Sequence, residues 1–190
     1  NDDSGFCLCE VHGAIEIGGG LLHGGISLPI DPGELSIEAR RRLRAGGETW
    51  LPIDRRTYQA ENQLNHGFGR QEGDGWAANT GDDQAGHMIY GPYASDWGDG
   101  PMQVVFDMMV DNTTADEFTV VTLDIFDATT QETVAVRPVT RDEFIAPFTH
   151  QDFAVEIDMT GRGGHTMETR VFWHDISYVR VDKVTVFGRQ

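Results

Sequence analysis

The chain has 190 residues, of which 39% are hydrophobic and 9% aromatic, and its formal net charge is −17 at pH 7. This length and apolar content suit one packed domain, or one domain with an appendage. The negative charge argues against nucleic acid and anionic membrane surfaces as partners, because both would repel the protein. The sequence also has no apolar run of about 18 residues, so we expect no membrane span.

The basic residues are almost all arginine: of 14 Lys and Arg residues, only Lys183 is lysine. An acidic, lysine-poor composition suits a surface adapted to high salt, where self-repulsion is screened. A GC-rich genome, which favours arginine codons, explains it equally well. Surplus carboxylates that bind divalent cations are a third explanation, and composition alone leaves all three open.

Residues 1–27 are rich in glycine, with apolar residues spread between the glycines, and we expect an extended arm. Its cysteines, Cys7 and Cys9, are too close together to close a stabilising loop. Three interpretations remain: a strained local disulfide or free thiols, a bond to a neighbouring chain, or a metal site that includes His12 and His23. The metal site is the weakest, because the paired spacing of zinc-binding motifs is missing.

A short helix is predicted at about residues 32–45. Asp31 is a good N-cap, Pro32 occupies the first helical position, and Gly46 and Gly47 end the helix. Together, the arm and this helix make an N-terminal region that we assign to residues 1–56.

From residue 57 to residue 190 the pattern changes to short alternating segments separated by polar turns. The predicted strands are 102–110, 118–126, 133–139, 153–159, 167–173 and 178–187. Strands at intervals of about 10 to 15 residues, without a long amphipathic helix between them, indicate a sandwich or barrel. We therefore predict an all-β domain, an antiparallel β-sandwich, over residues 57–190.

Several segments of this domain carry a family likeness. They are the opening Tyr58-Gln59-Ala60-Glu61, the turn Gly91-Pro92-Tyr93, Val104-Val105-Phe106, Leu123-Asp124-Ile125 and the closing segment from Tyr178 to Val186. Together they resemble carbohydrate-binding modules of the galactose-binding-like jelly-roll superfamily, with families 6 and 35 nearest. The resemblance implies a jelly-roll sandwich that is extracellular or at the cell surface and binds a polysaccharide or glycan.

The resemblance also implies a structural calcium ion. In these modules a Tyr-x-Ala-Glu strand opens the fold, an Asp on the last strand closes it, and the two together bind the ion. The corresponding ligands in this sequence are Gln59, Glu61 and Asp182, with main-chain carbonyls.

Sugar recognition needs aromatic faces for the ring and polar groups for the hydroxyls. The candidate ligand-binding residues are Trp76, Asn79, Tyr93, Trp97, Arg170 and Trp173. Trp76 and Trp97 lie between Gly and Asp residues in segments that we predict to be loops. Packing over the rim of the sandwich competes with ligand contact for these two, and a core position competes for Trp173.

The sequence gives little sign of catalysis. It has no His-Glu-x-x-His pair, no Gly-x-Ser-x-Gly turn and no phosphate-binding loop. His150 with Asp152, and His174 with Asp175, are possible acid–base pairs, but no nucleophile accompanies them. We expect a protein that is not itself an enzyme, or a module of a larger carbohydrate-active protein.

An alternative function is structural. An arm such as residues 1–27 can insert into the sheet edge of a neighbouring subunit. The sandwich would then be the building block of an extracellular filament, sheath or surface layer, with identical subunits as its partners.

Overall fold

A computed structural model of the protein describes residues 15–17, 20–22 and 56–188. The chain divides into two compact units, Asn1–Trp50 and Leu51–Gln190. In the first unit, β1 (Ile15–Ile17) pairs antiparallel with β2 (Gly20–Leu22). The helix predicted at about 32–45, the rest of the glycine-rich arm and its assembly role lie outside the described residues.

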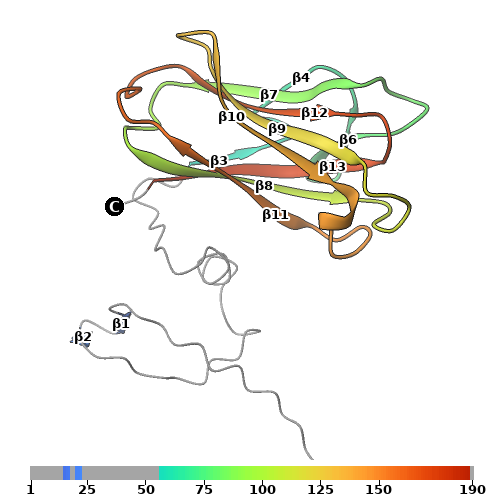
Figure 1. Ribbon diagram of the computed structural model, residues 1–190, viewed down its shortest axis with the longest axis horizontal. Coiled ribbons are helices and arrows are strands. Elements are labelled where there is room, and N and C mark those ends of the chain that lie inside the picture. Colours follow the sequence, from blue (N-terminus) through green and yellow to red (C-terminus); the bar gives the residue numbers. More distant parts are fainter. Residues whose placement is uncertain (1–14, 18–19, 23–55, 189–190) are drawn as a thin grey trace, which may run out of the picture. The chain divides into compact units, whose positions relative to one another are not determined.

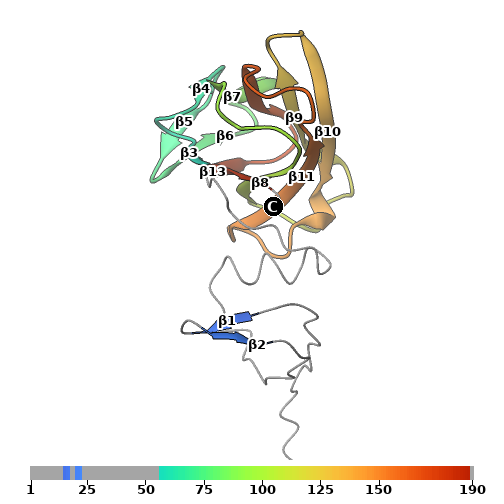
Figure 2. The ribbon, with the colours of Figure 1, turned by 90° about the vertical axis from the view of Figure 1, so that its left-hand side faces the viewer.

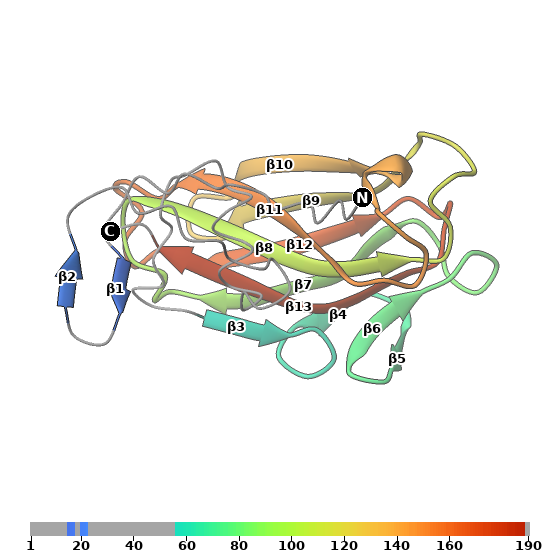
Figure 3. The same cartoon turned by 90° about the horizontal axis from the view of Figure 1, so that it is seen from below.

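The second unit contains two antiparallel sheets that lie face to face as two layers (Figures 1 and 2). The five-stranded sheet has the order β10-β9-β12-β7-β4, with β10 (Glu132–Thr140), β9 (Thr119–Asp127), β12 (Met167–Trp173), β7 (Gly86–Ala94) and β4 (Asn65–His66). The six-stranded sheet has the order β11-β8-β13-β6-β5, with β11 (Gln151–Asp158), β8 (Pro101–Val110), β13 (Val179–Gly188), β6 (Gly75–Ala78) and β5 (Arg70–Glu72), and β3 (Arg56–Gln59) also pairs with β13 (Figure 3). The predicted all-β sandwich is therefore confirmed.

Alternation along the long strands builds the core between the sheets. Phe106 and Met108 on β8 are fully buried, and so are Val171 and Trp173 on β12. Burying each such side chain contributes about 1.5–3 kcal/mol. Because successive side chains of a strand point to opposite faces, Arg170, which directly precedes Val171, points away from the core.

The opening and closing strands of the sandwich lie side by side, as the sequence predicts. β3 pairs antiparallel with β13, with Gln59 opposite Lys183. Just beyond β3, the Ala60 amide donates a hydrogen bond to the Asp182 carbonyl over 2.9 Å. The segments that carry Glu61 and Asp182 therefore meet where β3 ends beside β13.

A buried arginine ties together the loops at one end of the sandwich. Arg141, in the 3-10 helix η1 (Arg141–Glu143), donates to Asp116 Oδ1 over 2.9 Å, Ser177 Oγ over 2.9 Å and the Ile176 carbonyl over 2.7 Å. These partners satisfy a guanidinium that is only 3% exposed.

Within the described residues, no helix is long and apolar enough to be a membrane span.

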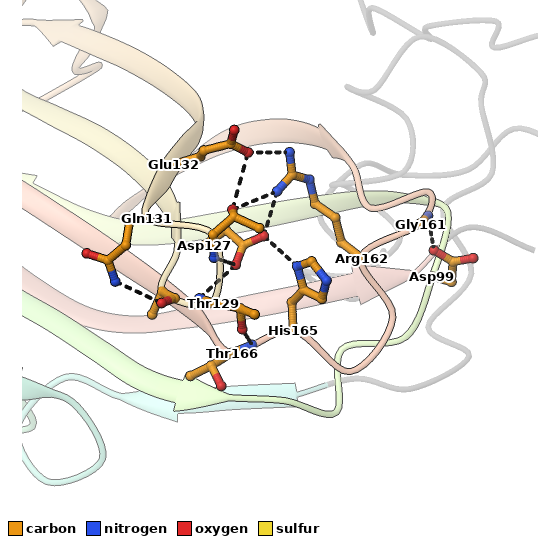
Figure 4. A network of polar contacts seen from close by, with 11 residues as sticks. Asp99, Asp127, Thr129, Gln131, Glu132, Gly161, Arg162, His165 and Thr166 are labelled. Atoms are coloured by element: carbon orange, nitrogen blue, oxygen red, sulfur yellow. Dashed lines mark hydrogen bonds and ion pairs between the residues drawn. The ribbon is translucent and has the colours of Figure 1, made fainter.

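A buried carboxylate fixes the loop between β11 and β12 (Figure 4). Asp127 is 0% exposed and accepts hydrogen bonds from Arg162 Nη1 over 2.5 Å and His165 Nδ1 over 2.7 Å. The Thr129 amide donates to the other carboxylate oxygen over 2.9 Å. Arg162 also binds Glu132 over 3.0 Å. The loop that joins the two sheets is thus held by charged hydrogen bonds.

Candidate functional site

A line of side chains crosses the outward face of the five-stranded sheet, the face that points away from the core. The strand registers place Val136 opposite Asp124, Asp124 opposite Arg170, Arg170 opposite Tyr90, and Tyr90 opposite Asn65. Directly opposite residues in antiparallel strands share a face. These five residues, called the central row below, therefore run across all five strands, β10 to β4 (Figure 1).

Arg170 is held at the middle of the central row by contacts on two sides. Its Nε donates to Asp124 Oδ1 over 2.6 Å, and its guanidinium lies 4.1 Å from the centre of the Phe126 ring. The other oxygen of Asp124 lies 3.5 Å from His87 Nε2. The side chains of Arg170 and Asp124 are only 19% and 8% exposed. The guanidinium is therefore fixed in position before any ligand arrives.

Glu168 lies beside the central row and is unusually well buried for an outward-facing carboxylate. It is 6% exposed and lies opposite Phe126 on β9 and Pro92 on β7. Burial, helped by the negative charge of Asp124, raises its pKa above the usual range for Glu, although the positive charge of Arg170 opposes the shift. The carboxyl group is thus a poorly solvated hydrogen-bond acceptor.

Aromatic rings surround these polar groups. Tyr93 is 47% exposed and meets Tyr90 edge-on, with ring centres 6.4 Å apart. Tyr93 adopts a left-handed conformation (φ 64°) directly after the cis Gly91-Pro92 bond. On the other side of the central row, Phe172 packs edge-on against His87 at 5.2 Å. The face therefore offers exposed ring surface next to charged hydrogen-bonding groups.

This combination suits a ligand that has both C–H surface and hydroxyl groups. Aromatic faces contact the apolar side of a sugar ring, while Glu168 and Arg170 can accept and donate hydrogen bonds. Arg170 and Tyr93 were both predicted from the sequence as ligand-binding residues, and the structure brings them to the same face. Sequence reasoning missed Asp124, which joins this site only through the register of β9 with β12.

Two of the predicted aromatic platforms are core residues. Trp173 is 0% exposed, and its Nε1 donates to the Ser177 carbonyl over 2.8 Å. Trp97 is 6% exposed and donates to the Tyr58 hydroxyl over 3.1 Å. Because neither indole presents a face to solvent, we remove both from the ligand-binding set.

Trp76 and Asn79 are not part of the central row. Trp76 is in β6 rather than in the expected loop, and it is partly buried. Its ring stacks on His66 at 3.4 Å, and its Nε1 donates to the Phe68 carbonyl over 2.7 Å. Asn79 donates to Asp82 Oδ2 over 3.2 Å in the following turn. Both are engaged in local packing and hydrogen bonding.

The predicted calcium ligands fit a cation in part. Glu61 Oε2 is buried and has no hydrogen-bond partner, while Oε1 accepts from Asn62 over 2.8 Å. A buried carboxylate oxygen without a partner is costly unless a cation balances it. Asp182 Oδ2, however, already lies 2.5 Å from Lys183 Nζ. Among the described residues, no group of three or more His, Cys, Asp or Glu could hold a metal ion.

The possible acid–base pairs are arranged differently from the sequence expectation. His150 Nδ1 lies 2.8 Å from Asp107, and His150 Nε2 lies 2.8 Å from Arg180. Burial lowers the pKa of His174, and its Nε2 lies 2.8 Å from the Thr122 hydroxyl. Both imidazoles are thus engaged with neighbouring side chains.

No protein-family model and no curated protein matches the chain. Among solved structures, the carbohydrate-binding module CBM6cm-2 of Cellvibrio mixtus lichenase 5A, in complex with cellotriose, matches at 13% identity and a TM-score of 0.45, over 74% of this chain and 100% of that one. CsCBM6-3 of Clostridium stercorarium, in complex with cellobiose, matches at 17% identity and a TM-score of 0.45, over 71% and 94%.

A cleaved adhesin domain (K3) of the Lys-gingipain of Porphyromonas gingivalis matches at 12% identity and a TM-score of 0.42, over 73% of this chain and 94% of that one. The solved structures similar to this chain thus include family 6 carbohydrate-binding modules, the class that its sequence resembles.

Proposed function

We propose that this protein is a non-catalytic, extracellular carbohydrate-binding β-sandwich stabilised by calcium. The observation that carries the proposal is the central row, in which Asp124 fixes the Arg170 guanidinium on an outward sheet face. Glu168 and the half-exposed ring of Tyr93 lie beside it. Fixed polar groups next to an accessible ring bind a glycan without a large cost in side-chain entropy.

The glycan would lie along the face of the five-stranded sheet. The Tyr93 ring would contact the apolar face of one sugar unit, and Arg170 would donate hydrogen bonds to its hydroxyls. Because the contacts are few and the site is open, we expect modest affinity that increases with the number of sugar units.

Calcium would be held by Glu61 and Asp182, with the Gln59 side chain or main-chain oxygens completing the set. The orphaned oxygen of Glu61 supports this part of the proposal. The ion would supply a cross-link between the opening and closing segments of the sandwich. The lysine beside Asp182 would then have to share that carboxylate with the ion.

Affinity electrophoresis through gels that contain single polysaccharides tests the binding function. We expect retardation by at least one β-glucan, xylan or related polymer, and a loss of about tenfold in affinity for Tyr93→Ala. Phe118→Ala is the matched control, since Phe118 is a 67% exposed aromatic residue outside the central row. No retardation in any gel, or equal losses for both variants, would reject the proposal.

A further inference from the structure

The charges on the outward face of the five-stranded sheet do not balance. β9 contributes Asp124, β12 contributes Glu168 and Arg170, and β7 contributes His87 and two tyrosines, Tyr90 and Tyr93. The residues of β10 that lie opposite the outward-facing Phe126, Asp124 and Thr122 of β9 are uncharged: Thr133, Val136 and Pro138. The face thus carries two carboxylates, Asp124 and Glu168, and one guanidinium, Arg170.

The guanidinium is committed to Asp124. The Arg170 Nε–Asp124 Oδ1 distance is 2.6 Å, and the guanidinium packs over Phe126. Among the described residues, none forms a salt bridge with Glu168. Arg170 attracts the Glu168 carboxylate only at longer range, and the neutral Tyr93 hydroxyl is hydrogen-bonded to it, so the excess negative charge of the face lies mainly on Glu168.

Glu168 is also buried deeply enough for its charge to matter to a ligand. At 6% exposure, water screens it poorly, so electrostatic interactions at this point are stronger than on an open surface. A neutral sugar hydroxyl can donate a short, charge-assisted hydrogen bond to the carboxylate. A sugar carboxylate or sulfate at the same place would bring two like charges together in a poorly solvated environment.

We propose that Glu168 is a specificity-determining residue that makes this face accept uncharged glycans and reject glycans with carboxylate or sulfate groups. The inference rests on the proposed function and adds the ligand class to it. The overall charge of −17 acts in the same direction, but salt screens it much more strongly than it screens a direct contact with the buried Glu168 carboxylate.

Acidification provides a second way to remove the same charge. The raised pKa of Glu168 means that it takes up a proton at a higher pH than an ordinary Glu. A protonated carboxyl group no longer repels an anionic sugar and can donate a hydrogen bond to it. The preference for uncharged over sulfated glycans should therefore weaken as the pH falls, because Glu168 loses its charge while the sulfate groups keep theirs.

The test compares matched polysaccharides that share a backbone: hydroxyethylcellulose with carboxymethylcellulose and cellulose sulfate, and methyl-esterified pectin with pectate. Dissociation constants are measured near neutral pH at physiological salt for the wild type, Glu168→Gln and Glu156→Gln. Glu156 is an exposed residue of β11 in the other sheet, so the control removes the same formal charge elsewhere.

We consider the matched polysaccharides whose shared backbone the protein binds. For these, we expect the wild type and Glu156→Gln to bind the uncharged polymer about tenfold or more tightly than its charged counterpart. Glu168→Gln should bring the two affinities within about threefold of each other. Equal wild-type affinities for both members, or an undiminished preference in Glu168→Gln, would overturn the inference but leave the binding function intact. No binding of any polymer would overturn both.

If Glu168→Gln does not fold, the wild type and His87→Asn decide, because His87 is the other side chain of this face that takes up a proton in the same pH range. The preference of both proteins for hydroxyethylcellulose over cellulose sulfate should decline between about pH 7 and pH 4.5. A constant wild-type preference, or a decline that His87→Asn abolishes, would contradict the role of Glu168.

Discussion

Asp124 and Arg170 lie directly opposite each other on β9 and β12, and the Arg170 Nε–Asp124 Oδ1 distance is 2.6 Å. The pair points away from the core but is largely shielded from solvent. Its geometry links stability to binding, because the carboxylate that stabilises the guanidinium also sets its direction. A variant that breaks the pair should therefore affect both properties.

Arg170→Met tests this link. The change leaves the Asp124 carboxylate, with a side chain that is only 8% exposed, without its main partner. We expect the free energy of unfolding to fall by about 2 kcal/mol in urea denaturation and glycan affinity to fall by about tenfold. Arg70→Met is the control, because the Arg70–Glu72 pair is exposed and should contribute less than about 1 kcal/mol. Equal losses for both variants would contradict a special role of the pair.

Asp127 should make the stability of the sandwich depend on pH. Burial alone would raise its pKa, but hydrogen bonds from His165 and Arg162 outweigh burial and hold the pKa well below its usual range. Because the folded pKa is depressed, this stabilisation is complete above the unfolded pKa of about 3.9 and is lost as the pH falls further, towards the folded pKa.

Urea denaturation as a function of pH measures this effect. Asp127→Asn should lower the free energy of unfolding by about 2 kcal/mol at neutral pH. Between about pH 4 and pH 2, the free energy of unfolding of this variant should fall less steeply than that of the wild type. Glu117→Gln, which changes an exposed carboxylate, should follow the wild-type curve. A wild-type stability that stays constant below about pH 4 would disagree with the depressed pKa.

The two buried indoles should matter for stability and not for binding. Trp97→Phe and Trp173→Phe each leave a small cavity and remove one hydrogen bond, so we expect a loss of about 2 kcal/mol in each case. The glycan affinity of the folded variants should stay within about twofold of the wild type. A large loss of affinity in a stably folded variant would return that tryptophan to the binding site.

Calcium should raise the thermal stability of the protein. An ion that binds only the folded state at about 100 times its dissociation constant adds about 2.7 kcal/mol, which corresponds to a few degrees in Tm for a chain of this size. Glu61→Gln should abolish this rise, because it replaces the carboxylate whose Oε2 has no partner. Glu117→Gln, which changes an exposed carboxylate elsewhere, should retain the rise in Tm with calcium. A wild-type Tm that responds neither to calcium nor to a chelator would exclude the site.

Strand β12 was predictable because the alternation along it is uninterrupted. The segment 167–173 was predicted with the bounds that β12 has, since Val171 and Trp173 alternate with Arg170 and Phe172. The pairing of β3 with β13 was predictable through the resemblance of the opening and closing segments. Local pattern and family likeness thus located most of the sandwich.

The site could not be predicted in full because it depends on register. Asp124 and Arg170 are 46 residues apart in the chain and become neighbours only through the alignment of β9 with β12. For Trp97, the flanking Gly and Asp residues suggested exposure, but the indole reaches the Tyr58 hydroxyl and is buried. Which side chains meet, and which loop residues pack inward, is decided by tertiary contacts.

Chemical-shift mapping of the backbone amides during titration with a binding oligosaccharide tests the central claim most directly. We predict that the shifts concentrate on β7, β9 and β12 around Tyr90, Asp124 and Arg170, and that Trp76 in the other sheet stays unchanged. Shifts centred on Trp76 or on the loop end around Phe148, with none on the central row, would show that the glycan site lies elsewhere.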